Sequence, residues 1–544
     1  DPVARPIGDG LSEPQAEAPG GQARRRLSGR HEVQAAVVVV GEHDAVPHEA
    51  VRAPTVLVDP RADRERRPDH VHRPVRAVAH HHAASAVVRA HLDPPQRAVG
   101  AVRRGRDPPL LAELWVADLD DAGAPVRPRH LGGGVDGAAF QPLFTADGTL
   151  WCALEAGDAS TLHRREGDEL VSASNADGEL GGPLWQLGRR AISEIDGGLV
   201  GLVTRQGRTA LVRFDRGGHT TALDDAHGTL GDLASDGSRV TVAVGWTGSA
   251  VQLVEHDLGT GASRVVADAL GAWLAPADRS EPEPVTFPTG GGELAHALFF
   301  APRRAGVRGP DGALPPLVVL AHGGPTGATT LAANPTVQFF TTRGFAVLDV
   351  NYRGSTGYGR AYRERLRGEW GVVDVEDCVA GARWAADRGR VDPTRRVIRG
   401  GSAGGYTVLQ ALANHDVFAA GACHYGVSDL EAMVTDTHKF ESHYDRYLVG
   451  PYPEARDRFV ARSPVHYPER ITVPVAFFHG LEDKAVPPDQ TERMASALRA
   501  RGIDAPFHGY PGEQHGYRRA ETLRHAHETE LAFYRRVLRL GAPG

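Results

Sequence analysis

The chain has 544 residues, of which 41% are hydrophobic and 24% are charged, and its formal net charge is -7 at pH 7. A chain of this length exceeds a single hydrophobic core, so we expect two domains of a soluble globular protein. The net charge argues against nonspecific affinity for nucleic acid, and no apolar run approaches the roughly 20 residues that span a bilayer. The cysteines are too few for a disulfide framework, and no basic-then-apolar leader is visible. A reducing, cytoplasmic compartment therefore suits the chain.

Residues 1–112 have an anomalous composition. No Phe, Tyr, Trp, Lys, Asn, Cys or Met occurs before Trp115, and nearly every residue is one whose codons can begin with C or G. We hypothesise that this segment results from reading a GC-rich gene in the wrong frame or on the wrong strand. The alternative is an authentic Arg/Pro/Ala-rich arm that binds acidic partners. In either case, the lack of aromatic side chains predicts no packed domain here.

Residues 113–280 show short alternating segments that are typical of β-strands. Asp-Gly turns that each open a strand recur at Asp147, Asp196 and Asp236. They lie roughly 40 to 50 residues apart, which suits the four-stranded blades of a β-propeller. A β-sandwich with similar turns is the alternative. The segment has room for roughly four blades of ~40 residues, too few for a closed seven-bladed ring, so the propeller is expected to be incomplete.

Residues 281–544 contain a candidate nucleophile. Ser402 lies in the run Gly-Gly-Ser-Ala-Gly-Gly at 400–405, between a strand-like segment at 395–399 and a helix-like segment at 406–412. A G-x-S-x-G turn between a strand and a helix presents a strained, exposed serine hydroxyl. Glycines at 400 and 404 permit the dihedrals and the close approach that this turn requires. By itself, the motif also suits an ordinary glycine turn.

Two further residues follow Ser402 in the order Ser, Asp, His that such folds use. A serine hydroxyl needs a base within hydrogen-bond reach and a carboxylate that orients this base. Asp483 follows the apolar strand at 473–478, and His515 lies in a glycine-flanked loop after the last strand-like segment. Asp483 could instead be a solvated acid in a charged loop. Packing or solvation explains three of the competing histidines better, namely His508, His525 and His527. The fourth, His479, lies at a strand end beside the acid loop and is interpreted as structural.

Two backbone N–H groups are expected to stabilise the oxyanion that acyl transfer develops. The turn His-Gly-Gly-Pro at 322–325 follows a short buried strand, which is the usual source of one donor, and the residue after the nucleophile supplies the other. We therefore assign the donors to Gly324 and Ala403. An ordinary Gly/Pro turn is the alternative, but four separate pieces in the expected order argue against it.

From about Glu283 to Leu540, the chain resembles the catalytic domain of the prolyl oligopeptidase family of serine peptidases. The resemblance is to the branch of acylaminoacyl and dipeptidyl aminopeptidases. Several short motifs carry the resemblance. Four of them hold the candidate site, namely 322–325, 401–406, Gly-Leu-Glu-Asp at 480–483 and Gly-Glu-Gln-His-Gly at 512–516. The others are Asn-Tyr-Arg-Gly-Ser-Thr-Gly-Tyr-Gly at 351–359, Trp370-Gly371, Asp374-Val375 and Asp377.

The resemblance implies an α/β-hydrolase domain preceded by a β-propeller that restricts access to oligopeptides. It also implies a triad of Ser402, Asp483 and His515, hydrolysis through an acyl-enzyme, and no metal or organic cofactor. We expect a serine peptidase of short peptides, including aminopeptidase-like action. The alternatives are a carboxylesterase of the same fold and a damaged peptidase that acts only as a propeller binding platform. Arg353 and Tyr358 could line the substrate cleft, although packing of a surface loop explains them equally well.

Overall fold

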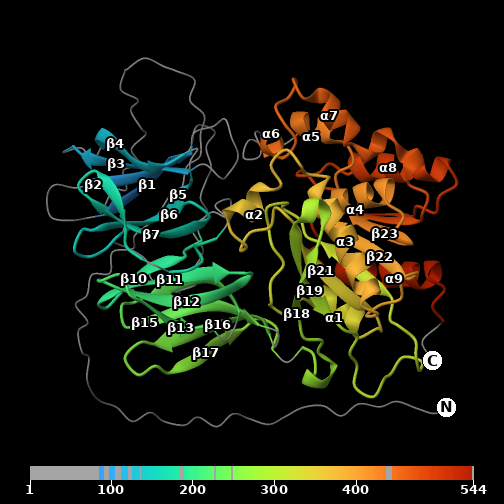
Figure 1. Cartoon of the computed structure of the whole chain (residues 1–544), viewed down its shortest axis with the longest axis horizontal. Coiled ribbons are helices and arrows are strands. Elements are labelled where there is room, and N and C mark those ends of the chain that lie inside the picture. The colour runs from blue at the N-terminus through green and yellow to red at the C-terminus, as the bar shows by residue number, and fades with distance from the viewer. Residues whose placement is uncertain are drawn as a thin grey trace, which may run out of the picture. The chain divides into compact units, whose positions relative to one another are not determined.

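The computed structural model describes residues 85–90, 97–103, 112–120, 125–134, 137–174, 176–182, 189–225, 228–246, 249–271, 273–436 and 444–541. In this part of the chain, antiparallel sheets come first and are coloured blue to green in Figure 1. A single large sheet with its helices follows in yellow to red. This is the predicted fold class, in which propeller-type sheets precede an α/β-hydrolase domain.

Four antiparallel sheets form the first region, and each is built on four strands that pair in chain order. The first has β1 (Ser85–Ala90), β2 (Arg97–Arg103), β3 (Ala112–Leu119) and β4 (Pro125–Gly133). The second has β5 (Ala139–Phe144), β6 (Leu150–Ala156), β7 (Ala159–Glu166) and β8 (Glu169–Ser172). The third has β10 (Ile192–Ile195), β11 (Gly198–Arg205), β12 (Arg208–Asp215) and β13 (Thr220–Asp224), with β9 (Glu179–Leu180) paired to β11. The fourth has β14 (Thr229–Ser235), β15 (Arg239–Trp246), β16 (Ser249–Asp257) and β17 (Ser263–Asp268).

The three Asp-Gly turns join the first and second long strands of the second, third and fourth sheets. In two of them, an aspartate oxygen accepts the backbone N–H two residues further on, from Thr149 to Asp147 (3.0 Å) and from Ser238 to Asp236 (3.1 Å). The glycine after each of the three aspartates has a positive φ, between 81° and 99°. The turn chemistry therefore accounts for the repeat, and the separate four-stranded units match blades rather than a sandwich.

The first sheet differs from the prediction for residues 1–112. β1 and β2 precede residue 113, and β2 pairs with both β1 and β3. The predicted start of the propeller at 113 therefore falls inside the first sheet. The segments Ser-Ala-Val-Val-Arg-Ala and Arg-Ala-Val-Gly-Ala-Val-Arg each contain two valines, and the β-branched valine favours strands without any aromatic side chain. The rest of that prediction, residues 1–84 above all, lies outside the described residues.

One eight-stranded sheet organises the second region, in the order β18-β19-β21-β20-β22-β23-β24-β25. β18 and β19 are antiparallel to their neighbours and the other strands are parallel. The strands are β18 (Glu283–Pro288), β19 (Leu294–Phe300), β20 (Leu317–Ala321), β21 (Ala346–Asn351), β22 (Arg396–Gly401), β23 (Ala420–His424), β24 (Val475–Gly480) and β25 (Phe507–Tyr510).

The helices of the second region connect these strands. They are α1 (Pro335–Thr341), α2 (Arg360–Glu364), α3 (Val373–Asp387), α4 (Ala403–Asn414), α5 (Leu430–Asp436), α6 (Tyr444–Leu448), α7 (Arg456–Ala461), α8 (Asp489–Ala500) and α9 (Ala520–Val537). Short 3₁₀ turns lie at η1 (Pro276–Asp278), η2 (Gly290–Gly292), η3 (Pro464–His466) and η4 (Pro468–Arg470).

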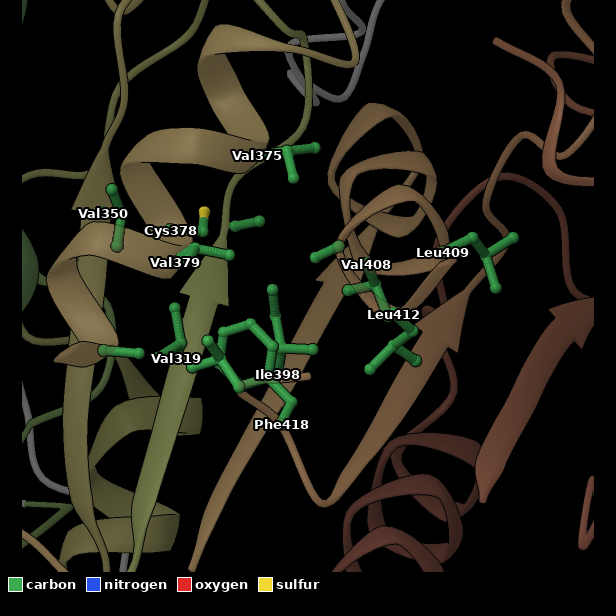
Figure 2. Close-up of a cluster of buried hydrophobic side chains, with 14 of the residues drawn as sticks. Val319, Val350, Val375, Cys378, Val379, Ile398, Val408, Leu409, Leu412 and Phe418 are labelled. Carbon is green, nitrogen blue, oxygen red and sulfur yellow. The ribbon is translucent and has the colours of Figure 1, made fainter. Parts of the chain in front are cut away.

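The large sheet is buried on both faces. Val319 and Ile398 point to one face, where they meet side chains of α3 and α4 such as Val379 and Val408 (Figure 2). The residues that precede them in β20 and β22 point to the opposite face, which α1 and α9 cover. Because successive strand residues alternate between faces, continuous apolar runs are needed to fill both layers. This packing fixes the carboxyl ends of β20, β22, β24 and β25, and the loops that carry the site begin there.

Candidate active site

Ser402 lies at the tight turn between β22 and α4. Its φ of 56° and ψ of -124° are unusual for a residue with a side chain, a strain of about 1–3 kcal/mol that the surrounding fold must hold. A side chain at Gly404 would place its Cβ 2.1 Å from the Ala321 carbonyl oxygen. The Ser402 N–H donates to the carbonyl of His424, at 3.0 Å. The turn is therefore a nucleophile elbow in its geometry as well as in its sequence.

His515 connects Ser402 to Asp483. Its Nε2 lies 2.9 Å from Ser402 Oγ, and its Nδ1 lies 2.7 Å from Asp483 Oδ2. An ionised carboxylate can only accept, so Nδ1 carries the proton and Nε2 is left to accept from the serine hydroxyl. The three side chains come from the ends of β22, β24 and β25, and the structure brings all three together.

Asp483 is held as an acceptor by four groups. Its Oδ1 accepts the backbone N–H groups of Ala485 (2.9 Å) and Val486 (3.0 Å), and its Oδ2 also lies 3.2 Å from His479 Nε2. Burial alone would raise the pKa of Asp483, but hydrogen bonds from His479 and His515 outweigh it and hold this pKa well below its usual range. The carboxylate is therefore charged at neutral pH.

The two assigned oxyanion donors lie on opposite sides of Ser402 in the chain. Gly324 has a φ of 125° and lines the cavity in front of Ser402 together with Gly323. Ala403 is the first residue of α4, where an N–H group has no acceptor within the helix. His322 supports the glycine turn, since its ring lies 2.8 Å from Ser355 Oγ and stacks on Tyr352 at 4.2 Å.

A cavity of about 640 Å³ opens in front of Ser402. Two charged strand residues, Asp349 and Arg399, form part of its wall beside the candidate catalytic groups. The lining comprises Leu320, Ala321, His322, Gly323, Gly324, Thr326, Ala328, Thr329, Thr330, Asn334, Thr336, Asp349, Arg399, Gly400, Gly401, Ser402, Tyr425, Tyr444, His515 and Gly516. This volume falls in the range of about 300–1,000 Å³ that small-molecule sites occupy.

Comparison with known proteins places this site in a family. A family model described as the prolyl oligopeptidase family matches residues 332–541. The solved structure of a puromycin-hydrolyzing peptidase of Mycobacterium tuberculosis superposes with a TM-score of 0.80 and 36% sequence identity. The match covers 82% of this chain and 69% of that one. The chain belongs to the prolyl oligopeptidase family.

Curated members of the prolyl oligopeptidase family match over a shorter stretch. An acylamino-acid-releasing enzyme of Arabidopsis thaliana is 30% identical over 220 residues, which are 39% of this chain and 29% of that enzyme. Dipeptidyl aminopeptidase BIII of Pseudoxanthomonas mexicana is 31% identical over 212 residues, 38% of this chain and 31% of that enzyme. The matched segment thus spans about a third of the length of these curated relatives.

Arg353 and Tyr358 belong to a loop motif of the family but do not line the cavity. The Arg353 guanidinium is buried against Asp377 (2.8 Å) and Glu376 (2.7 Å). The Tyr358 ring stacks on His296 at 4.4 Å, and burial raises the pKa of its hydroxyl. The structure therefore favours loop packing over the predicted cleft role, because the carboxylates at the start of α3 draw the arginine away from the cavity.

Sequence reasoning missed Asp349 and Arg399 as members of the site. Each is a charged residue directly after a run of apolar residues, Ala-Val-Leu in β21 and Val-Ile in β22, and this interruption is the signal that could have identified them. His479, the competing histidine interpreted as structural, lies beside Asp483. Its ring is fully buried and contacts Thr491 Oγ1 (2.6 Å) as well as Asp483.

The described residues offer neither a metal-binding cluster nor a membrane-spanning helix. Within the ranges given above, no three His, Cys, Asp or Glu side chains gather in a way that could hold a metal ion. In the same ranges, no helix combines the length and the apolar character needed to cross a membrane.

Proposed function

We propose that the chain is a serine peptidase that hydrolyses peptide bonds of short peptides through an acyl-enzyme. The observation that supports this most is the continuous hydrogen-bonded path from Ser402 Oγ through His515 to Asp483, at the mouth of a cavity. Membership of the prolyl oligopeptidase family supports the same reaction class. The names of the curated relatives, an acylamino-acid-releasing enzyme and a dipeptidyl aminopeptidase, favour action near the amino terminus of a peptide.

In the proposed acylation, Ser402 Oγ attacks the carbonyl carbon while its proton passes to His515 Nε2. The oxyanion that forms is stabilised by the N–H groups of Gly324 and Ala403, each worth about 2.7–4 kcal/mol in comparable sites. The C–N bond then breaks, and His515 returns the proton to the leaving amine. This leaves an ester on Ser402 and a free amine product.

In the proposed deacylation, His515 Nε2 takes a proton from water as the water oxygen attacks the ester carbonyl. Collapse of the second tetrahedral intermediate breaks the bond to Oγ, and His515 protonates Ser402. The Asp483 carboxylate stays ionised and holds the ring with Nε2 toward the serine. The net reaction adds one water across one peptide bond.

We also propose a cytoplasmic location. All three cysteines, Cys152, Cys378 and Cys423, are free and buried, which suits a compartment that keeps thiols reduced.

The test is active-site labelling and turnover of the purified 544-residue chain. We expect a fluorophosphonate probe to label Ser402, and Ser402→Ala to lose both labelling and hydrolysis of aminoacyl para-nitroanilides. Ser496→Ala, at an exposed serine of α8, is the matched control and should keep both. Labelling that persists in Ser402→Ala would overturn the assignment.

Comparison of substrates separates the proposed peptidase from an esterase. A peptidase should show a kcat/KM for peptides, anilides or puromycin that is comparable with or above that for simple esters. A chain that turns over only esters would contradict the peptidase proposal. A chain that folds but reacts with neither substrate nor probe would indicate a binding platform.

A further inference from the structure

Three residues in register across the large sheet form one wall of the cavity. Leu320 of β20 pairs with Asp349 of β21 on one side and with Arg399 of β22 on the other. All three line the cavity, and we call them the cavity floor. Neighbouring strands lie about 4.8 Å apart, so the backbones of the acid and the base are separated by roughly 10 Å, with an apolar side chain between them.

The carboxylate of the cavity floor is only partly satisfied. Asp349 Oδ2 accepts a hydrogen bond from Thr329 Oγ1 at 2.6 Å. Within the described residues, its Oδ1 has no hydrogen-bond partner, and no ion pair joins it to Arg399. Asp349 is 4% exposed and lines the cavity, so its surroundings are the cavity rather than bulk water. One acceptor is therefore available to a bound molecule.

The guanidinium of Arg399 in the cavity floor makes hydrogen bonds through two of its three nitrogens. Arg399 Nε donates to Glu530 Oε1 at 2.8 Å, and Nη2 lies 3.1 Å from His424 Nε2. Nη1 has no hydrogen-bond partner among the residues that the structure describes, and the side chain is 15% exposed. One donor is therefore available to the same cavity.

Charge selects the kind of molecule that fits. Burial raises the pKa of Asp349 to about 6, so the carboxylate is mostly ionised at pH 7.5. Burial alone would raise the pKa of Glu530, but Arg399 and His424 hold it well below its usual range, so Glu530 balances the charge of Arg399. A simple anion would meet Asp349, and a simple cation would meet Arg399. A molecule that carries a positive charge at one end and a negative charge at the other is attracted by both residues.

We propose that the cavity floor binds a free dipeptide as its zwitterion, with the ammonium on Asp349 and the carboxylate on Arg399. The charged ends of an extended dipeptide lie about 7 Å apart, a span of the same order as the roughly 10 Å between the two backbones. The inference rests on the proposed function, because hydrolysis of short peptides releases such molecules. Since Ser402 and His515 line the same cavity, a bound dipeptide competes with substrate and inhibits its own formation.

The first experiment uses the unmodified chain and an aminoacyl para-nitroanilide as substrate. Glycylglycine should inhibit competitively. N-acetyl-glycylglycine and glycylglycine amide each lack one charge and should inhibit at least about tenfold more weakly. Equal inhibition by the three compounds, or none by glycylglycine at concentrations up to tens of millimolar, would overturn the proposal.

Asp349→Asn tests the ammonium end, because the amide keeps the shape and an oxygen for Thr329. The inhibition constant of glycylglycine should rise about tenfold, whereas that of N-acetyl-glycylglycine, which has no ammonium, should stay constant. Asp489→Asn, at an exposed aspartate of α8, is the matched control and should change neither constant. A parallel rise for both compounds in Asp349→Asn would indicate a structural role and contradict the proposal.

Calorimetry on Ser402→Ala separates this inference from the proposed function. Heat of binding from glycylglycine, with at least about tenfold weaker binding of both blocked forms, supports the cavity floor even if the chain hydrolyses nothing. Turnover in the unmodified chain together with no binding preference in Ser402→Ala would leave the peptidase proposal intact and refute the dipeptide site. The same measurement decides the matter if Asp349→Asn fails to fold.

Discussion

The large sheet and the fourth antiparallel sheet bury their apolar residues to very different degrees. Every residue of β20, β21, β23 and β24 is buried, whereas every residue of the edge strand β17 is exposed. On β17, Val265 and Val266 are 54% and 49% exposed and project from its two faces. Helices on both faces of a sheet bury its apolar side chains within the same domain. The apolar side chains of a blade are buried only where another sheet packs against it. The precise geometry of the site belongs to the region that completes its own core.

The largest expected effect is a loss of activity, and it comes from a substitution in the second region. His515→Ala should lower kcat/KM for an aminoacyl anilide by about 10⁴-fold or more, because in the proposed mechanism His515 takes the proton from Ser402. The thermal midpoint should change little, since the ring is about one-third exposed. His525→Ala, on the surface of α9, is the control. Activity within tenfold of the unmodified chain would contradict the assigned base.

The next effect is structural and concerns Arg353. Arg353→Gln leaves the fully buried Asp377 without its cation, so the free energy of unfolding should fall by about 3–5 kcal/mol, as measured by urea denaturation. At a temperature where the variant remains folded, KM should be unchanged, because the side chain does not line the cavity. Arg365→Gln, whose ion pair with Glu293 is exposed, should cost less than about 1 kcal/mol. A KM that rises in Arg353→Gln without loss of stability would restore the cleft role.

A smaller effect is the pH dependence of stability that Asp349 contributes. Burial raises its pKa from the ordinary 3.8 to about 6, so the folded state holds the proton more tightly. This contribution is present below about pH 4 and is lost as the pH rises through 6, amounting to about 3 kcal/mol. The difference in unfolding free energy between the unmodified chain and Asp349→Asn should therefore change by that amount between pH 4 and pH 8. A constant difference would show that burial does not control this carboxyl.

The smallest effect concerns the exposed edge strand. Replacing both Val265 and Val266 by Thr should change the free energy of unfolding by no more than about 0.5 kcal/mol each, because neither side chain is buried. The double variant should associate less at high concentration, as measured by light scattering. An exposed apolar edge strand can pair with the edge strand of another molecule, and threonine makes this edge more polar. Val240→Thr together with Val242→Thr, in the buried strand β15, should be strongly destabilising by comparison.

Much of this architecture could be predicted from local patterns. The elbow at Ser402 combines a strand, glycines and a helix within a short stretch, and the Asp-Gly turns repeat at a spacing set by the blades. Asp483 and His515 could be selected because each lies in a loop directly after a strand-like segment. These features are readable because neighbouring residues determine them.

The remainder depended on contacts between distant segments. Arg399 looks like an interruption of a buried strand until Glu530, far along the chain, is seen to pair with it. Arg353 looks like a cleft residue because it follows a strand, yet its long side chain turns to the carboxylates of α3. β1 and β2 were missed because neither segment alternates apolar with polar residues and the composition of residues 1–112 argued against a packed domain.

The hydrogen bond from Ser402 to the His424 carbonyl also has a temporal consequence. The ring of His424 lies 3.0 Å from Glu530 of α9, so the backbone that supports the nucleophile is braced by a helix translated well after it. Asp483 and His515 likewise emerge after the elbow. During synthesis, the first region can fold while the nucleophile still lacks its base, its orienting acid and its brace. The proposed site can therefore assemble only after α9 has been synthesised, which makes its formation a late step of folding.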